Sequence, residues 1–237
     1  NSLFLSTAIG LNNLQLLPVF NWFKEELIIL SAQESRFKNI SIDKICDDDE
    51  KRKIMPYLNM ADPSILDVLV ELKNPTDNYD HLSEKIREKF MDMKVPYIKF
   101  IHPNNTTLKP RDESQGTNKI LMLAGFWLEM LESRRVVVID ELDNSLHPLL
   151  VKFLIREVYN VDRVKDNSQL IFSTHNTSLL NSDIFRRDQI WFIEKDRDHS
   201  TQLYSLIDFK PRKNEAIEKG YLQGRYGSVP YINDWDS

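Results

Sequence analysis

The sequence predicts an α/β fold: a mostly parallel sheet flanked by helices, with a helical and β-hairpin insertion. Three observations lead to this prediction. Residues 136–139 (VVVI) are a β-branched run, typical of a strand buried on both faces of a sheet. Residues 117–132 carry apolar side chains at helical spacing. Residues 170–172 and 190–193 are predicted to be further short buried strands. Strands that alternate with helices, such as residues 148–159, indicate a parallel sheet.

The first 30 residues are predicted to be an N-terminal helical segment of the core. Pro18 precedes an apolar stretch, residues 19–30, whose aromatic side chains favour one face of a helix. The chain begins at Asn1 without a methionine. That is consistent with a processed product or with a piece of something longer.

Residues 31–108 are more polar and are predicted to be an insertion, an arm or a lid. Residues 65–72 and 95–101 are rich in β-branched side chains and favour strands. Between them, residues 82–90 have helical spacing. The acidic run at residues 47–50 is typical of the start of a helix. Residues 109–237 form the third region, where the α/β pattern begins.

Composition excludes several classes of protein. The formal net charge of −5 gives no overall electrostatic case for nucleic acid, although a local basic face stays open. Cys46 is the only cysteine, which excludes a disulfide framework and a thiolate metal cluster. The sequence has no apolar run near 18 residues and no signal-peptide pattern in its first ten, so we expect a cytoplasmic protein with no membrane contact.

Two acidic residues follow the strand at residues 136–139. Carboxylates at the carboxyl edge of a parallel sheet lie where open α/β folds bind ligands. Buried acids are costly unless a cation or hydrogen bonds compensate them, and Mg²⁺ with nucleotide phosphates is the usual compensation. Because adjacent strand side chains point to opposite sides, Asp140 is expected to support the metal and Glu141 to polarise the attacking water. The alternative is a strand that merely ends in a solvated acidic turn.

Two further segments add to this pattern. The strand at residues 170–172 leads into Ser173, Thr174 and His175, which puts His175 at the same sheet edge, within reach of a γ-phosphate. Ser114 precedes the apolar helix and can cap it, and Gly116 lets the backbone approach a ligand while free N–H groups attract anions. Taken singly, a structural or surface histidine and an ordinary N-cap are the better explanations of these residues.

Together these residues resemble the motifs of ABC-type ATPases. Glu113-Ser114-Gln115-Gly116-Thr117 looks like the signature motif, VVVIDE resembles Walker B, Asn144-Ser145-Leu146-His147 is similar to the D-loop, and Ser173-Thr174-His175 looks like the switch-histidine motif. The resemblance implies an incomplete ABC-type P-loop NTPase fold that binds ATP and Mg²⁺. It implies that Glu141 and His175 are catalytic and that Asp140 holds the metal. It further implies nucleotide contacts from Ser114, Gln115, Gly116, Thr117 and Ser145.

Among ABC ATPases, the sequence most resembles the prokaryotic AAA-like subgroup, allied to the overcoming-lysogenization-defect nucleases and to SMC/Rad50 proteins. The resemblance covers about residues 109–232, including the tail at residues 224–230. It implies a homodimer joined through nucleotide, a clamp-like switch, a role in phage defence or DNA-linked processes, and a separate nuclease or effector partner. Nucleic acid stays open as a partner.

The phosphate-binding loop, G-x-x-x-x-G-K-[ST], is absent from the sequence. None of the six glycines is followed by lysine. We expect that this loop lies in a missing N-terminal part and that the piece alone is inactive; the alternative is a degenerate relative that no longer uses ATP. Two other functions stay open. One is a metal-dependent nuclease that uses Asp140, Glu141, Asp143, His147 and His175, and the other is a non-catalytic interaction or dimerisation module.

Overall fold

The computed structural model describes residues 3–30, 36–73, 95–160, 162–164, 168–196, 198–212 and 215–229. The chain divides into two compact units, Asn1–Thr174 and His175–Ser237, and each is considered by itself. None of the helices in the described ranges has both the length and the hydrophobicity needed to cross a bilayer.

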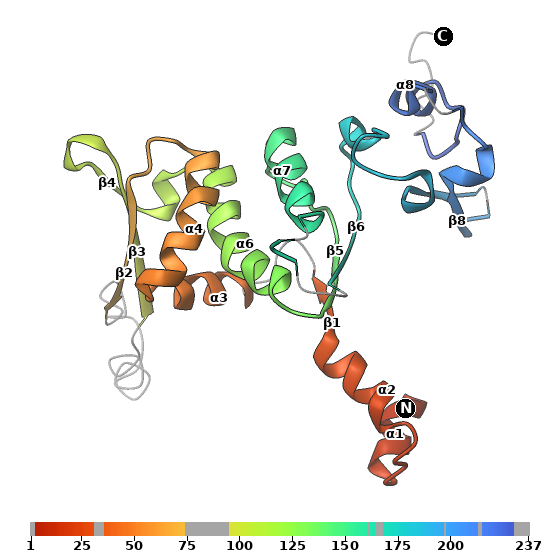
Figure 1. Ribbon diagram of the computed structural model, residues 1–237, viewed down its shortest axis with the longest axis horizontal. Coiled ribbons are helices and arrows are strands. Elements are labelled where there is room, and N and C mark those ends of the chain that lie inside the picture. Colours follow the sequence, from red (N-terminus) through yellow and green to blue (C-terminus); the bar gives the residue numbers. More distant parts are fainter. Residues whose placement is uncertain are drawn as a thin grey trace. The chain divides into compact units, whose positions relative to one another are not determined.

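The first unit contains a parallel sheet of three strands, β1 (Leu27–Leu30), β5 (Val136–Ile139) and β6 (Gln169–Phe172), in the order β1-β5-β6 (Figure 1). Ile139 of the central strand stands in register with Leu30 on one side and Phe172 on the other. The predicted α/β class with a parallel sheet flanked by helices is confirmed.

The two faces of this sheet differ in burial. Leu30, Val137 and Ile139 point to one face and are buried. On the other face, Ile29 and Ile171 flank Val138 and are more than half exposed. The sequence predicted that the central strand is buried on both faces, whereas the described residues cover only one of them.

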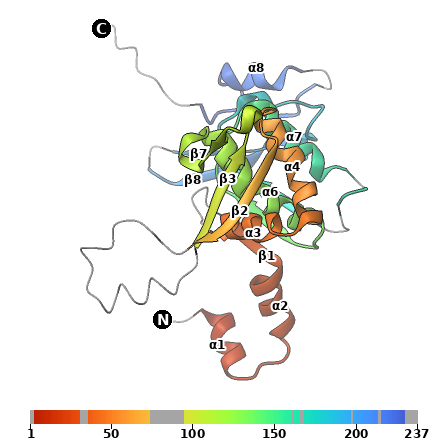
Figure 2. The same ribbon diagram turned by 90° about the vertical axis from the view of Figure 1, so that its left-hand side faces the viewer.

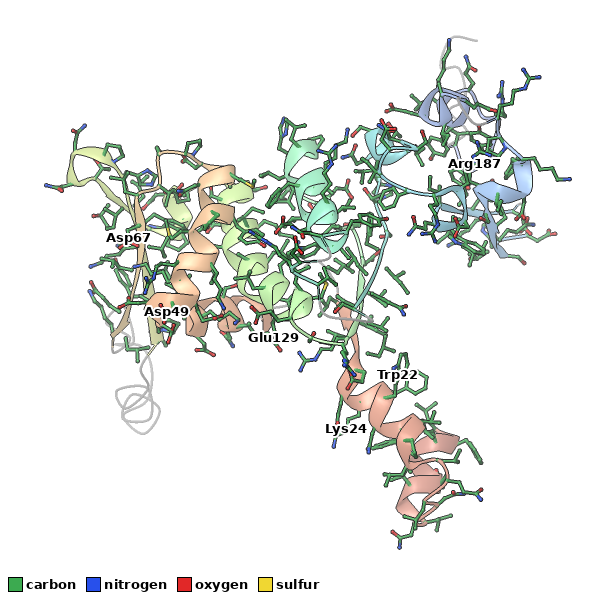
Figure 3. All side chains as sticks on the ribbon, viewed as in Figure 1. Trp22, Lys24, Asp49, Asp67, Glu129 and Arg187 are labelled. Carbon is green, nitrogen blue, oxygen red and sulfur yellow. The ribbon has the colours of Figure 1, made fainter. Side chains whose placement is uncertain are left out.

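The N-terminal segment consists of two helices and the strand β1. Helix α1 spans Phe4–Gly10, α2 spans Leu17–Asn21, and a π-helical turn covers Trp22–Glu26 (Trp22 and Lys24 are labelled in Figure 3). The helix predicted for residues 19–30 is therefore wrong in its last four residues. An apolar run as short as LIIL suits a helix and a strand equally, and parallel pairing with β5 decides for the strand.

Three helices, α3 (Arg36–Ile45), α4 (Asp48–Ala61) and α6 (Gln115–Leu131), pack against one another. Asp47 caps α4 by accepting hydrogen bonds from the amides of Asp49 and Glu50, in agreement with the acidic start predicted there. Ser41 fixes α3 to α6, because its Oγ donates to the Met122 carbonyl and accepts from the Gly125 amide, each at 2.9 Å.

A second, antiparallel sheet consists of β2 (Asp67–Lys73), β3 (Val95–Ile101) and β4 (Thr107–Leu108). It lies next to α4 (Figures 1 and 2), and β2 also contacts α3. Val68, Ile98 and Phe100 are buried. Asp67, labelled in Figure 3, pairs with Lys51 of α4 at 2.6 Å. Both strands predicted in this region are confirmed, and the helix predicted for residues 82–90 lies outside the described residues.

A further helix of the first unit, α7 (Pro148–Val158), follows β5 and confirms the helix predicted from residue 148. Short 3-10 turns occupy Pro103–Asn105 and Pro110–Asp112 in this unit and Thr177–Leu179, Arg187–Gln189 and Leu206–Phe209 in the second unit.

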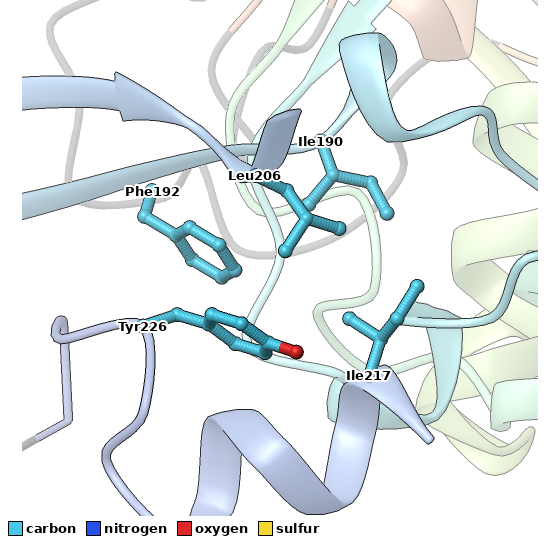
Figure 4. Close-up of a cluster of buried hydrophobic side chains, with 5 residues drawn as sticks. All are labelled: Ile190, Phe192, Leu206, Ile217 and Tyr226. Atoms are coloured by element: carbon cyan, nitrogen blue, oxygen red, sulfur yellow. The ribbon is translucent and has the colours of Figure 1, made fainter. Parts of the chain in front are cut away.

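The second unit contains an antiparallel pair, β7 (Trp191–Lys195) and β8 (Thr201–Ser205), and the helix α8 (Ile217–Leu222). Figure 4 shows its core, which consists of Ile190, Phe192, Leu206, Ile217 and Tyr226. The strand predicted at residues 190–193 exists, but Trp191 and Ile193 are exposed. Antiparallel partners need only one covered face, and the predicted burial is therefore wrong for these two residues.

Candidate functional site

The carboxyl ends of β5 and β6 bring polar side chains together. Ile139 and Phe172 are in register, so the next residue of each strand, Asp140 and Ser173, emerges at the same edge. The Ser173 hydroxyl donates to Oδ1 of Asp140 at 2.5 Å and accepts from the Glu141 amide at 2.8 Å. The hydroxyl thus holds the Asp140 carboxylate and the Glu141 backbone in one fixed arrangement at the sheet edge.

Glu141 does not continue the strand. Its φ of 51° lies in the left-handed region, which is uncommon for a residue with a side chain and is typical of functional turns. The alternation of strand side chains that predicted different directions for Asp140 and Glu141 therefore does not apply, because β5 ends at Ile139. The Glu141 carboxylate instead accepts a hydrogen bond from Nδ2 of Asn144 at 3.3 Å.

A half-buried cation lies near this carboxylate. Burial lowers the pKa of the Lys119 ammonium, and the negative charge of Glu141 opposes that shift. Lys119 belongs to the second turn of α6. The N-terminal part of this helix and the turn after β5 therefore share one electrostatic environment.

The segment Glu113–Thr117, here called the signature-like segment, begins α6. Ser114 is the N-cap, and its Oγ accepts from the Thr117 amide at 3.0 Å. The amides of Gln115 and Gly116 fall in the first turn, where a helix provides no carbonyl partner, and such amides attract anions. Thr117 is buried, and its hydroxyl is 2.8 Å from Ser114 Oγ, so it supports the cap from inside the protein.

Gly116 packs closely against the turn that follows β5. A Cβ at Gly116 would lie 3.3 Å from the Ser145 carbonyl oxygen, a tight contact that a larger side chain would worsen. Ser145 has a φ of 64°, and its hydroxyl donates to Oδ1 of Asn144 at 3.1 Å. The signature-like segment and the turn at Asp143–Ser145 thus adjoin within one chain.

His147 belongs to the first unit, and His175 begins the second. His147 caps α7, because its Nδ1 accepts from the Leu149 amide at 3.2 Å. His175 is the first residue of the second compact unit, two positions after Ser173 in the sequence. Its placement relative to Glu141 is a prediction from the sequence.

The acidic edge of the sheet offers few protein ligands for a metal ion. Among the residues that the structure describes, no group of three or more His, Cys, Asp or Glu side chains is arranged to hold a metal ion. Mg²⁺ does not need such a group where phosphate oxygens and water complete its shell. One exposed carboxylate at the sheet edge, that of Asp140, fits this requirement.

Sequence reasoning did not single out Ser173, Asn144 or Lys119 as site residues. The position of Ser173 could have indicated its role, because Ser173 directly follows β6 and Asp140 directly follows the neighbouring strand β5. Lys119 has no comparable signal, since its proximity to Glu141 depends on how α6 packs.

Residues 16–181, more than half of the chain, match the family described as AAA domain, putative AbiEii toxin, Type IV TA system. The chain belongs to this family of AAA domains. A search of curated proteins finds no match for this AAA domain. Solved structures that match it include the crystal structure of the Smc head bound to the C-winged helix domain of ScpA, at 13% identity and a TM-score of 0.42. That match covers 76% of the AAA domain chain and 55% of the solved chain, so this chain spans about half of its length.

Proposed function

We propose that this chain is the part of an ABC-type ATPase that carries the signature, Walker B, D-loop and switch-histidine motifs, of the AAA-like subgroup allied to the overcoming-lysogenization-defect proteins. The observation that supports this most is the Ser173 hydroxyl, which ties the ends of two parallel strands together through Asp140 and Glu141. A fixed carboxylate pair at this edge suits a magnesium-bound triphosphate.

In this proposal, each residue of the sheet edge has its own task. Asp140 holds Mg²⁺, which neutralises charge on the phosphate oxygens. Glu141 orients and polarises the attacking water. Its left-handed backbone and its hydrogen bond from Asn144 limit the directions that the carboxylate can take. His175 contacts the γ-phosphate, a role that rests on its position two residues after Ser173.

The signature-like segment acts on a nucleotide held by a second copy of the chain. Ser114, Gln115 and Gly116 present the N-terminal amides of α6 to the γ-phosphate of that copy, and Thr117 supports the cap. Ser145 lies at the junction between the subunits. The close approach of Gly116 to the Ser145 carbonyl supports this role, because both would then belong to the surface that meets the other subunit.

The phosphate-binding loop is the part of the proposal that the sequence does not contain. None of the glycines precedes a lysine. We therefore propose that the loop comes from sequence outside these 237 residues, and that this piece alone does not hydrolyse ATP. The intact ATPase would form a homodimer around ATP in the cytoplasm, and hydrolysis would let the two copies separate as a clamp. Residues 31–108 would be the arm or lid, between the N-terminal segment 1–30 and the catalytic half 109–237.

The biological setting is proposed from the same resemblance. An ATP-driven clamp of this kind would serve phage defence or a DNA-linked process, together with a separate nuclease or effector protein. Co-purification from the native operon, followed by a nuclease assay with and without the partner, tests this. DNA cleavage by this chain alone with Mn²⁺ would favour a nuclease site instead.

The ATPase proposal is tested with the protein that includes the phosphate-binding loop. Glu141→Gln keeps the size of the side chain and removes its charge, and is expected to lower kcat at least ~100-fold while ATP still binds and holds the dimer together. Glu132→Gln is the matched control, because Glu132 is exposed at the end of α6 and pairs with Lys53 at 3.4 Å. Hydrolysis at the wild-type rate in Glu141→Gln would contradict the role given to Glu141.

A further inference from the structure

A buried histidine contacts the residue that opens the signature-like segment. His102 directly follows β3 and is 8% exposed. Its Nε2 lies 2.6 Å from Oε1 of Glu113, whose side chain is 4% exposed. A carboxylate removed from water to this extent is costly without a partner. This contact is therefore specific, unlike an exposed surface ion pair.

Hydrogen bonding on the other side of the ring fixes where its protons lie. Nδ1 of His102 is 3.0 Å from Ser64 Oγ, and that hydroxyl donates to Oδ1 of Asp62 at 2.7 Å. A hydroxyl has a single proton, so Ser64 must accept from Nδ1–H. On the other side of the ring, a second proton lies between Nε2 of His102 and Oε1 of Glu113 and forms the hydrogen bond that joins them. An unbroken hydrogen-bonded path runs from the end of α4 to Glu113.

Asp62 and His102, two members of this path, make further interactions. The pKa of the Asp62 carboxyl is lowered most by the hydrogen bond from the Ser64 hydroxyl and next by the one from the Ser64 amide. The electrostatic effect of His102 lowers it further. The His102 amide donates to the Thr106 carbonyl at 2.8 Å, which fixes the backbone of His102 to the turn between β3 and β4. His102 therefore belongs rigidly to the β2–β3–β4 sheet.

Glu113 is covalently joined to Ser114, the N-cap of α6. A fixed Glu113 therefore limits the backbone conformations open to Ser114. The Ser114 hydroxyl accepts the hydrogen bond from the Thr117 amide. Gly116 lies in the same turn, against the Ser145 carbonyl. A displacement of Glu113 would shift this whole first turn of the helix.

We propose that His102 is a positioning residue: through its hydrogen bond to Glu113 it sets the first turn of α6 and links the β2–β3–β4 sheet to the nucleotide. The role in nucleotide binding rests on the proposed function. The mechanical link does not, since it concerns this chain alone. A displacement of β3 would move the His102 imidazole, and the hydrogen bond to Glu113 would pass this displacement to the signature-like segment.

Two substitutions distinguish the hydrogen bond to Ser64 from the hydrogen bond to Glu113, because each keeps an N–H donor near only one of the two ring nitrogens. His102→Asn keeps a donor in the place of Nδ1 and cannot reach Glu113, whereas His102→Gln keeps a donor in the place of Nε2 and loses Ser64. Amide hydrogen exchange of Thr117 is measured in both, with the Ser173 amide, which donates to Ile139 in the parallel sheet, as the internal reference. We expect exchange at Thr117 to rise about tenfold in His102→Asn and little in His102→Gln, as loss of one hydrogen bond would produce.

Three outcomes would overturn the link. They are an unchanged exchange rate at Thr117 in His102→Asn, an equal rise at Thr117 and Ser173 (which would mean only a loss of global stability), and an equal rise in both variants. If neither variant folds, Glu113→Ala is compared with Glu132→Ala by the same measurement. A rise at Thr117 confined to Glu113→Ala supports the link, and its absence overturns it.

The second arm uses the intact ATPase. We expect kcat/KM for ATP to fall about tenfold in His102→Asn and to stay within about twofold of wild type in His102→Gln, since small misplacements of a binding group are costly. A wild-type protein without ATPase activity would contradict the proposed function and leave the exchange result to decide the link. An active wild type with equally active variants would contradict only the part played by His102 at the nucleotide.

Discussion

The Ser173 hydroxyl lies 2.5 Å from Oδ1 of Asp140 and accepts a hydrogen bond from the Glu141 amide at 2.8 Å. One oxygen atom thus joins β6 to both acidic residues that follow β5. The parallel register of Ile139 with Phe172 brings the ends of the two strands close enough for this bridge.

The first prediction concerns this bridge. Ser173→Ala removes both hydrogen bonds, and we expect the free energy of unfolding to fall by about 1 kcal/mol, because water can replace part of what an exposed hydroxyl provided. In the intact ATPase we expect a fall of about tenfold in kcat, as Asp140 and Glu141 lose their common support. Ser173→Thr keeps the hydroxyl and serves as the control. Wild-type hydrolysis by Ser173→Ala would show that the bridge is structural alone.

The second prediction concerns the contact between α3 and α6. A Cβ at Gly125 would lie 2.5 Å from Cα of Ser41. This is a backbone atom, which can move only if helix α3 moves with it. We expect Gly125→Ala to destabilise the first unit by about 1–3 kcal/mol through overpacking, despite the higher helix propensity of alanine. Gly10→Ala is the control, because nothing lies within 4 Å of its added Cβ. Urea unfolding of the two variants measures the difference, and equal midpoints would contradict the close contact.

The third prediction concerns the tail glycines of the second unit. Gly224 and Gly227 both have φ near 70°, so alanine is strained at either position. At Gly227 an added Cβ would also overlap the Tyr204 hydroxyl, whereas at Gly224 it would lie 3.6 Å from Cγ2 of Val229. We therefore expect Gly227→Ala to lower the melting temperature of this unit clearly more than Gly224→Ala. Similar losses in both variants would mean that backbone strain alone decides.

The fourth prediction is a pH dependence. A hydrogen bond from the Tyr226 hydroxyl at 2.7 Å, followed by the Arg212 amide and the Arg225 guanidinium, lowers the pKa of Glu215 from 4.5 to about 2. Because the pKa is lower in the folded state, the stabilisation is fully present above pH 4.5 and is lost as the pH falls towards 2.

A carboxyl-detected NMR titration measures this pKa directly. We expect a wild-type value near 2 and a value closer to 4.5 in Tyr226→Phe, which removes the largest cause. Arg212→Ala is a useful control, because the backbone amide that bonds Glu215 is kept. A wild-type titration near 4.5 would contradict the arrangement.

Local patterns predicted the elements whose signals are local. The helix from Gln115, the strand Val136–Ile139 and the polar residues after β5 and β6 follow from periodicity and β-branched composition. The strand β1 was missed because its four apolar residues have no period of their own, and its partner lies far along the chain. The contact of His102 with Glu113 was also missed, since no repeat relates the end of β3 to the start of α6.

The pairing of Leu27 with Val136 has a kinetic consequence. A chain segment of more than a hundred residues must be closed before these strands meet, and that closure is entropically unfavourable until the intervening helices have collapsed. We expect β1 to join late during refolding, after the buried Trp127 of α6 is enclosed. A molecule caught between these two events would expose the open edge of β5 to strands of other chains.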